Sequence, residues 1–481
     1  MTDSISDRHA TRLGRAIAPR AARHPGLSGV LALEDGVDAF AARHWLAQLA
    51  ERTIDVQYYI WEADTSGRLL FSALLEAAKR GVQVRVLLDD NNTSGMDALL
   101  ARLDSHPNIQ VRLFNPFSFR TLRALGYLTD FARLNRRMHN KSFTVDGEVT
   151  IVGGRNVGDA YFGVGEQPIF SDLDVLTIGE VVPQVSADFE AYWNSASVKP
   201  LSSVVSESLA DNGIGLTDSE SDSPTARRYL ERLTTTSFAR HIETGELPLI
   251  WAPASLLSDD PRKGQGREDR KSLLAERFHK VIGAPEVQLD LISAYFVPTR
   301  SGVALLLSLA RRGVKIAILT NSLAANDVSV VHAGYARWRK KLLRRGIALY
   351  ELKPDPQMPH ALHDRGLTGS SGSSLHAKTF SVDNKKVFIG SFNFDPRSAM
   401  LNTEMGLVIE SEELALTIHQ RFTEGQRRVA WELRLDRWGR LNWVDEDARG
   451  HLQVHKHEPE TRFWQRVVVR LASRLPIEWL L

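Results

Sequence analysis

Two stretches of the chain carry the same reactive side chains at the same spacing. Residues 139–156 read HNKSFTVDGEVTIVGGRN and residues 376–393 read HAKTFSVDNKKVFIGSFN, and they align without a gap. Seven of the eighteen aligned positions are identical, including a His, a Lys two residues later and a final Asn. Side chains alternate along a strand, so we expect His and Lys on one face, with a tight glycine turn returning the Asn beside them. The candidate catalytic residues are His139, Lys141, Asn156, His376, Lys378 and Asn393.

This set of side chains suits a substrate that carries negative charge and is attacked covalently. A phosphodiester fits, because one imidazole attacks phosphorus while the other protonates the leaving alkoxide. The Lys and Asn side chains hold the non-bridging oxygens as charge develops. This chemistry needs no metal and no cofactor, and the sequence has no H-E-x-x-H motif that would bind a metal.

Four other motif residues have more modest predicted roles. Asp146 and Asp383 follow the predicted strand at a turn, so capping of the strand end explains them better than chemistry does. Gly154 and Ser391 occupy the turn before the Asn and are candidate substrate-binding residues. The Ser391 hydroxyl would donate a hydrogen bond to phosphate.

The segments that must position these motifs are repeated as well. Residues 55–90 and 289–322 each predict a strand, a helix that ends at Arg-Gly, and a second apolar strand. Strands that alternate with helices indicate parallel pairing with helical cover. We therefore predict an α/β protein of two tandem repeats, each a mixed, largely parallel β-sheet flanked by helices, packed about a pseudo-two-fold axis.

Composition changes along the chain predict its division into segments. Residues 201–231 are rich in Ser, Asp, Thr and Gly, and residues 258–271 form a second polar stretch, so both are expected as surface excursions. The predicted segments are an N-terminal segment (1–30), a first lobe (31–200), a linker or excursion (201–249), a second lobe (250–430) and a C-terminal hairpin with an amphipathic tail (431–481).

Composition also narrows the class of protein. The 481 residues include 60 Lys and Arg against 58 Asp and Glu, a net charge of +2, so no global field attracts nucleic acid. The absence of cysteine excludes disulfides, iron–sulfur clusters and a cysteine nucleophile, and it is typical of a reducing compartment. We expect no signal peptide, and no apolar stretch approaches the about 20 residues of a membrane helix. Contact with a membrane is expected only from its surface.

The paired motifs resemble the phospholipase D superfamily, the HKD enzymes, and most closely the bacterial cardiolipin synthases of the C type. The segments that carry the resemblance are QYYIW at 57–61, GGRNVGDAYF at 153–162, GSFNFDPRSAMLNTEMG at 390–406 and LPIEWLL at 475–481. The resemblance implies a metal-free site between the lobes and a phosphohistidine intermediate. It also implies transfer of a phosphatidyl group to phosphatidylglycerol, with His139 as nucleophile and His376 as general acid.

Members of this superfamily also carry an acidic residue after each motif that orients a catalytic imidazole. Glu404 matches that role in the second repeat, and Asp172 matches it in the first, with Asp174 as the alternative. A reacting histidine needs its tautomer fixed by a hydrogen-bonded carboxylate, so the physical reason holds apart from the resemblance.

Two segments predict contact with lipid. Residues 114–138, directly before the first motif, mix aromatic residues with arginines, and Arg136 and Arg137 are candidate substrate-binding residues. A partly buried helix with solvated arginines is the alternative. In the tail, arginines recur every fourth residue from Arg462 to Arg474 beside an apolar face, as in helices that lie in a membrane surface. Docking of this helix on the protein's own core is the alternative.

These observations predict a peripheral cardiolipin synthase on the cytoplasmic face of the bacterial inner membrane. Its expected partners are anionic phospholipids, with phosphatidylglycerol as acceptor and phosphatidylglycerol or phosphatidylethanolamine as donor; a small partner protein stays open. A phosphodiester hydrolase, either a phospholipase D or a nuclease, would use the same two histidines. A catalytically inactive lipid-binding relative is disfavoured because both motifs are intact. The near-neutral charge disfavours the nuclease.

Overall fold

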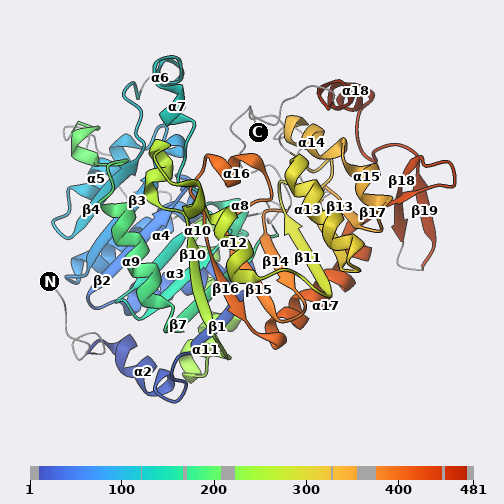
Figure 1. The fold of residues 1–481 in the computed structure, drawn as a ribbon. Helices are drawn as coiled ribbons and strands as arrows, with labels where there is room; N and C mark the ends of the chain where they lie inside the picture. Colours follow the sequence, from blue (N-terminus) through green and yellow to red (C-terminus); the bar gives the residue numbers. More distant parts are fainter. Residues whose placement is uncertain are drawn as a thin grey trace.

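The computed structural model describes residues 10–120, 122–165, 171–206, 223–326, 329–354, 375–446 and 450–473. Figure 1 shows two lobes side by side, each a twisted β-sheet with helices packed against it. The expected C-terminal segment LPIEWLL and residue Arg474 lie outside the described residues.

The first sheet has nine strands among the described residues, in the order β8-β4-β3-β2-β5-β6-β7-β1-β9. Its strands are β1 (Ser28–Leu33), β2 (Thr53–Tyr58), β3 (Gln83–Asp89), β4 (Ile109–Phe114), β5 (Ser142–Val145), β6 (Val149–Gly153), β7 (Asp174–Gly179), β8 (Val198–Pro200) and β9 (Ile250–Ala252). The helices of this lobe are α2 (Arg12–Ala21), α3 (Gly36–Leu49), α4 (Thr65–Lys79), α5 (Asp97–Asp104), α6 (Arg123–Thr129), α7 (Phe131–Leu134), α8 (Asp159–Phe162), α9 (Val182–Trp193), α10 (Pro224–Leu233) and α11 (Ser237–Thr244).

The second sheet has ten strands within the described ranges, in the order β10-β16-β15-β14-β11-β12-β13-β17-β18-β19. Its strands are β10 (Ala254–Ser258), β11 (Gln288–Ser293), β12 (Lys315–Asn321), β13 (Ala348–Leu352), β14 (Lys378–Val382), β15 (Lys386–Gly390), β16 (Met405–Glu410), β17 (Ala430–Leu435), β18 (Leu441–Glu446) and β19 (Leu452–His455). Its helices are α12 (Leu274–Ile282), α13 (Arg300–Arg311), α14 (Ser329–Ala336), α15 (Arg339–Leu343), α16 (Pro396–Met400), α17 (Glu412–Val429) and α18 (Phe463–Ala472).

Most neighbouring strands are antiparallel, so the expectation of largely parallel sheets was wrong. Parallel pairing occurs where a helical crossover joins the strands, in β2-β3-β4 and in β11-β12-β13. The motif strands instead form the hairpins β5-β6 and β14-β15, because a turn of a few residues can join only antiparallel neighbours. The α/β organisation of two tandem repeats with mixed sheets flanked by helices is confirmed.

The ends of the two lobes differ from the expected boundaries. Strand β9 pairs with β1, so the first sheet takes in residues as far as Ala252. Residues 201–249, expected as a linker, contain α10 and α11, whose Tyr229 and Phe238 are buried in the core of the first lobe. At the other end, β17, β18 and β19 extend the edge of the second sheet, so this sheet continues past residue 430.

The contacts between the lobes are reciprocal. An apolar layer joins β6 and β7 of the first sheet to β15 and β16 of the second. Above it, Met138 forms a backbone bridge with Thr403, and Ser171 forms one with Leu375. Each bridge pairs the residue before a motif histidine with the residue before a candidate carboxylate of the other lobe. An approximate two-fold arrangement requires this kind of exchange.

Candidate active site

Each motif histidine is bound by a carboxylate from the other lobe. His139 Nδ1 lies 2.8 Å from Glu404 Oε2, and His376 Nδ1 lies 2.5 Å from Asp172 Oδ2. The backbone bridges between the lobes hold both pairs, because each bridge ends one residue before the side chains that meet. With Nδ1 engaged, Nε2 is the nitrogen of each ring that is left to react.

Asp174, the alternative to Asp172, has a different partner. Its carboxylate accepts a hydrogen bond from the guanidinium of Arg43 at 2.8 Å and another from the backbone N–H of Arg155. Both side chains of the Arg43–Asp174 ion pair are buried. Asp174 therefore joins β7 to α3 and does not contact an imidazole.

Both motif lysines are buried beside the histidines. Lys141 is 1% exposed and Lys378 is 2% exposed, and each ammonium donates to the backbone carbonyl of its own motif histidine. Burial lowers the pKa of Lys378 to about 8. Burial and the charge of Lys378 hold the pKa of Lys141 well below its usual range. Two neighbouring buried cations make this a place for an anion.

The two carboxylates differ in charge at neutral pH. Burial raises the pKa of Glu404 to about 7. Burial acts in the same direction on Asp172, but the neighbouring His376 and Lys378 outweigh it and hold its pKa well below the usual range. The imidazoles themselves are kept neutral at pH 7, because burial and the lysines lower the pKa of His376 to about 3 and that of His139 well below its usual value.

The motif asparagines are oriented by the loops that follow β2 and β11. Asn156 Oδ1 accepts a hydrogen bond from the backbone N–H of Ile60 at 3.3 Å, and Asn393 Oδ1 accepts one from Tyr295 at 3.4 Å. With each oxygen engaged, the NH2 group is the end that can donate to a substrate oxygen. The Asn156 NH2 group also donates to Tyr161.

Two tyrosines that sequence reasoning did not assign to the site lie against the histidines. Tyr59 packs edge-to-face on His139, with ring centroids 5.0 Å apart, and Tyr161 packs in the same way on His376 at 5.1 Å. Tyr59 directly follows β2. Its position in a run of aromatic residues at the end of a predicted strand could have indicated that it lies at the site. Tyr161 reaches a histidine of the other lobe, which no spacing within one repeat could show.

Asp146 and Asp383 act as structural caps, as the sequence predicted. Each adopts positive φ, 54° and 55°, in the hairpin turn after the motif strand. The Asp146 carboxylate accepts from the backbone N–H groups of residues 51, 52 and 53, and Asp383 accepts from residues 286, 287 and 288. Each thus fixes the start of the neighbouring central strand, β2 or β11.

The structure does not support substrate binding by Ser391 or Gly154. Ser391 is fully buried and its hydroxyl donates to Glu404 Oε2, so its single proton is not available to a phosphate. A Cβ at Gly154 would lie 2.2 Å from Asp172 Oδ1. Gly154 therefore makes room for the carboxylate of Asp172, and Ser391 positions that of Glu404.

Arg136 and Arg137 were also expected to bind substrate, and the structure gives both of them protein partners. Arg137 is 1% exposed and pairs with the buried Asp89. Arg136 donates to the backbone carbonyls of Lys263 and Met400, bridging the lobes. Sequence reasoning placed these arginines correctly beside the motif but could not see the carbonyls that bind them.

A buried ion pair behind Glu404 was missed. Residues 258–271 were expected as a surface excursion, yet Lys263 is fully buried and its ammonium lies 2.8 Å from Asp259 Oδ2. The backbone N–H of Glu404 donates to the same Asp259 oxygen, at 3.0 Å. The signal available in the sequence was the spacing of an acid and a base four residues apart.

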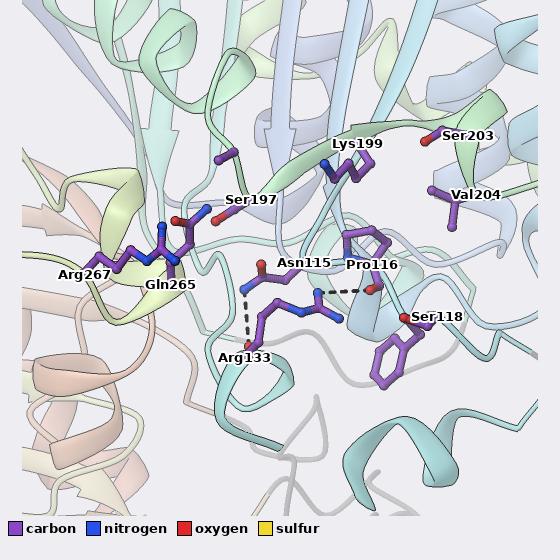
Figure 2. Close-up of a pocket in the computed structure, with 12 residues that line it drawn as sticks. Asn115, Pro116, Ser118, Arg133, Ser197, Lys199, Ser203, Val204, Gln265 and Arg267 are labelled. Carbon is purple, nitrogen blue, oxygen red and sulfur yellow. Dashed lines mark hydrogen bonds between the residues drawn. The ribbon is translucent and has the colours of Figure 1, made fainter. Parts of the chain in front are cut away.

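A polar hollow of about 830 Å³ lies beside the segment that leads to the first motif (Figure 2). Arg133, Lys199 and Arg267 line it, and no carboxylate is among the lining residues within the described ranges. Figure 2 shows Arg133 donating to the carbonyl of Pro116 and accepting at its own carbonyl from Asn115. The hollow is thus a cationic recess next to α6 and α7.

The two segments predicted to contact lipid expose apolar side chains. In 114–138 the arginines have protein partners, and the exposed large apolar residues in the described part are Phe119, Leu122, Leu125, Leu128 and Phe131. In the tail, α18 docks on α14 through the buried Val469, so docking accounts for one side of the helix. Its other side leaves Trp464, Val468 and Leu471 exposed at the spacing of a helical stripe.

Two searches of the described residues gave no candidates. No group of three or more His, Asp or Glu side chains in the described ranges is placed to hold a metal ion. No helix in that part of the chain is long and apolar enough to span a membrane.

The sequence matches a known protein family. The family described as "Cardiolipin synthase, PLD-like domain" matches residues 46–193 and 279–425, one match for each lobe. Cardiolipin synthase C of Escherichia coli (strain K12) is 64% identical over 472 residues, covering 98% of this chain and 100% of that protein. Cardiolipin synthase A of Pseudomonas syringae is 27% identical and covers 84% of this chain and 70% of that protein. The expected resemblance is confirmed.

A solved structure supports the fold. The phosphatidylserine synthase of Haemophilus influenzae covers 98% of this chain and 99% of its own, with a TM-score of 0.61 and 14% sequence identity. The fold of the two lobes together is therefore found in a solved structure.

Proposed function

The chain belongs to the cardiolipin synthase family with phospholipase D-like domains, and we propose that it transfers a phosphatidyl group to phosphatidylglycerol through a phosphohistidine. The negative charge of a bound phosphodiester raises the pKa of the neighbouring His376, which takes up a proton at Nε2. In the first half-reaction Nε2 of His139 attacks phosphorus, the bond from phosphorus to the leaving alkoxide breaks, and His376 gives that proton to the alkoxide. In the second, His376 takes the proton of the acceptor hydroxyl, whose oxygen attacks phosphorus and releases His139.

The observation that carries this proposal is the crossed pairing of histidines and carboxylates. Each imidazole is held at Nδ1 by the other lobe, so both present Nε2 to one centre at the lobe interface. The lysine of each repeat lowers the pKa of the histidine in the other, which supports a shared site. A phosphodiester between the rings would be held by both ammonium groups.

The protein is proposed to work at an anionic membrane surface. Exposed apolar residues occur on α6, α7, α16 and α18, and Figure 1 shows these helices along one side of both lobes. Helices α7 and α16 adjoin the motifs in sequence, so the same side carries the site. The cationic recess of Arg133, Lys199 and Arg267 complements anionic headgroups there. We propose peripheral attachment to the cytoplasmic face of the inner membrane.

Product analysis tests the transfer. Purified protein is incubated with vesicles of phosphatidylglycerol and phosphatidylethanolamine, with each lipid omitted in turn, and the products are identified by mass spectrometry. Formation of cardiolipin that requires phosphatidylglycerol is expected, and the omission series identifies the donor. Phosphatidic acid as the sole product would show a hydrolase and overturn the proposal. The matched control is His139→Ala/His376→Ala, which keeps the lipid-facing helices and removes both reacting rings.

A further inference from the structure

An apolar hollow of about 330 Å³ lies in the second lobe, between α12 and α13, and has no part in the chemistry described above. Its floor is the sheet, at β11 and β14, and its walls are the two helices. The lining includes Phe278, Ile282, Leu305, Leu306, Phe380 and Val382. The charged residues among its described lining are the carboxylates Glu276 and Asp395, with no Lys or Arg, so an anionic headgroup is not the matching ligand.

The hollow continues the face of the sheet that carries the second motif. Lys378, Phe380 and Val382 are alternate residues of β14, so their side chains share one face, with the lysine at the active-site end. At that end Phe392 and Phe394 also line the hollow, on either side of Asn393. A molecule with a phosphate at the histidines and a hydrocarbon chain along β14 would meet a polar site and then an apolar one.

The corresponding place in the first lobe is filled. When the motifs are aligned, Phe162 of α8 corresponds to Ala399 of α16. When residues are counted back from the first residues of β2 and β11, Phe40 of α3 corresponds to Ala275 of α12. The rings of Phe40 and Phe162 pack edge-to-face with centroids 5.2 Å apart.

Two phenyl rings of the first lobe are thus two methyl groups in the second, and both alanines line the hollow. Helix α10 reinforces the contrast, because its Tyr229 packs on Phe40 in the first lobe. Protein interiors are close-packed, so an apolar hollow of this size is typical of a ligand site rather than of a core.

We propose that this hollow binds one acyl chain of the phospholipid whose phosphate lies between the two histidines. The inference rests on the proposed function, since it assigns the chain of that same substrate. A phosphate that reaches buried histidines pulls the first methylenes of its chains out of the bilayer. The hollow keeps those methylenes away from water.

The test fills the hollow with the ring that the first lobe already has there. Ala399→Phe should lower kcat/KM for long-chain phosphatidylglycerol about tenfold relative to turnover of a soluble p-nitrophenyl phosphodiester. The reason is that each methylene returned to water changes a binding constant about fourfold. Ala275→Phe should act in the same direction. Leu416→Phe, which adds apolar surface on the exposed side of α17, is the matched control.

A direct readout uses phosphatidylglycerol with a diazirine near the carboxyl end of one chain, among the methylenes that the hollow should hold, crosslinked in vesicles and mapped by mass spectrometry. Labels on α12, α13 or residues 392–399 that Ala399→Phe abolishes support the proposal. Labels elsewhere, or an unchanged ratio of lipid to soluble turnover in a variant with normal thermal melting, overturn it. If the labels map to the hollow but no cardiolipin forms, the proposed function fails and the acyl site stands. If cardiolipin forms but Ala399→Phe behaves as wild type, the proposed function stands and the acyl site fails.

Discussion

The two motif histidines occupy equivalent positions in related repeats, but their surroundings differ. His376 lies against Asp172, whose charge persists at neutral pH, whereas His139 lies against Glu404, whose pKa is about 7. A permanent anion stabilises an adjacent imidazolium more than a carboxyl that is half protonated. The difference therefore suits His376 to the donation of a proton and His139 to attack on phosphorus.

The aromatic residues that contact the histidines are also distributed unequally between the two lobes. The first lobe supplies both tyrosines that pack on the histidines, Tyr59 and Tyr161, while the second has Ala294 and Ser398 at the aligned positions. The second lobe also has the apolar hollow. The first lobe thus places aromatic rings against both reacting histidines, and the second has the hollow that we propose for an acyl chain.

Alanine at either histidine should have the largest effect. His139→Ala and His376→Ala should each lower overall transfer about 10⁴-fold or more, because both rings act in both half-reactions. The variants should differ with a p-nitrophenyl phosphodiester, whose leaving group needs no proton. We expect a burst and an acid-labile phosphoenzyme with His376→Ala and neither with His139→Ala, measured by rapid quench. The opposite pattern would exchange the two roles.

The backing carboxylates should have the next largest effect, and an unequal one. Asp172→Asn removes a full charge and should cost about 10³-fold in kcat, whereas Glu404→Gln removes a partial charge and should cost about 10²-fold. Steady-state kinetics at pH 7 compares them. Equal losses would show that the two carboxylates carry the same charge in the working enzyme and would remove the basis for different roles.

The pH dependence of kcat/KM distinguishes the two carboxylates in the wild-type protein, without a substitution that lowers activity. Glu404 gains its charge as pH rises through about 7, and Lys378 loses its charge as pH rises through about 8, so a narrow bell between these values is expected. Asp172 should add no limb, because its pKa lies well below the usual range. In Glu404→Gln the acid limb should disappear. An acid limb that survives in this variant would belong to another group.

The sequence predicted the parts of the site that lie within one repeat. The His, Lys and Asn spacing and the capping by Asp146 and Asp383 follow from local alternation and turn geometry, whereas Glu404 was assigned through the resemblance to the superfamily. It also predicted two α/β repeats, because the strand–helix–strand pattern is local. The largely antiparallel pairing was not predicted. The strand–helix–strand pattern indicates only the parallel pairs, whereas the hairpins around each motif make most of the pairs antiparallel.

The parts that sequence reasoning missed all involve two distant segments. It preferred Asp172 and kept Asp174 as the alternative, because the contact with His376 that distinguishes the two residues comes from the other lobe. It did not find the protein partners of Arg136, which lie in the other lobe, or those of Ser391 and Arg137, which lie in the same lobe but on other strands and loops. The buried Lys263 was hidden in a polar stretch whose composition is typical of an exposed loop. The exchange of carboxylates between the lobes depends on how the two lobes pack, which the pattern within one repeat does not show.

The capping aspartates should give the smallest effect and the most even one. Asp146 and Asp383 each accept hydrogen bonds from three successive backbone N–H groups, and asparagine also tolerates their positive φ. Each Asn variant should lower the free energy of unfolding by about 1 kcal/mol, through loss of charge-assisted hydrogen bonds, with more loss at the buried Asp146. Urea unfolding at pH 7 measures this difference in the free energy of unfolding.

The stabilisation by Asp383 should also depend on pH. Three backbone N–H groups hold the pKa of Asp383 below its ordinary 3.8 against the effect of burial. The contribution of this carboxylate to stability is therefore present above that pH and is lost as pH falls below it. The Asp383→Asn difference should therefore shrink in acid. A loss of activity in either variant without a loss of stability would place these aspartates in the chemistry and contradict their role as caps.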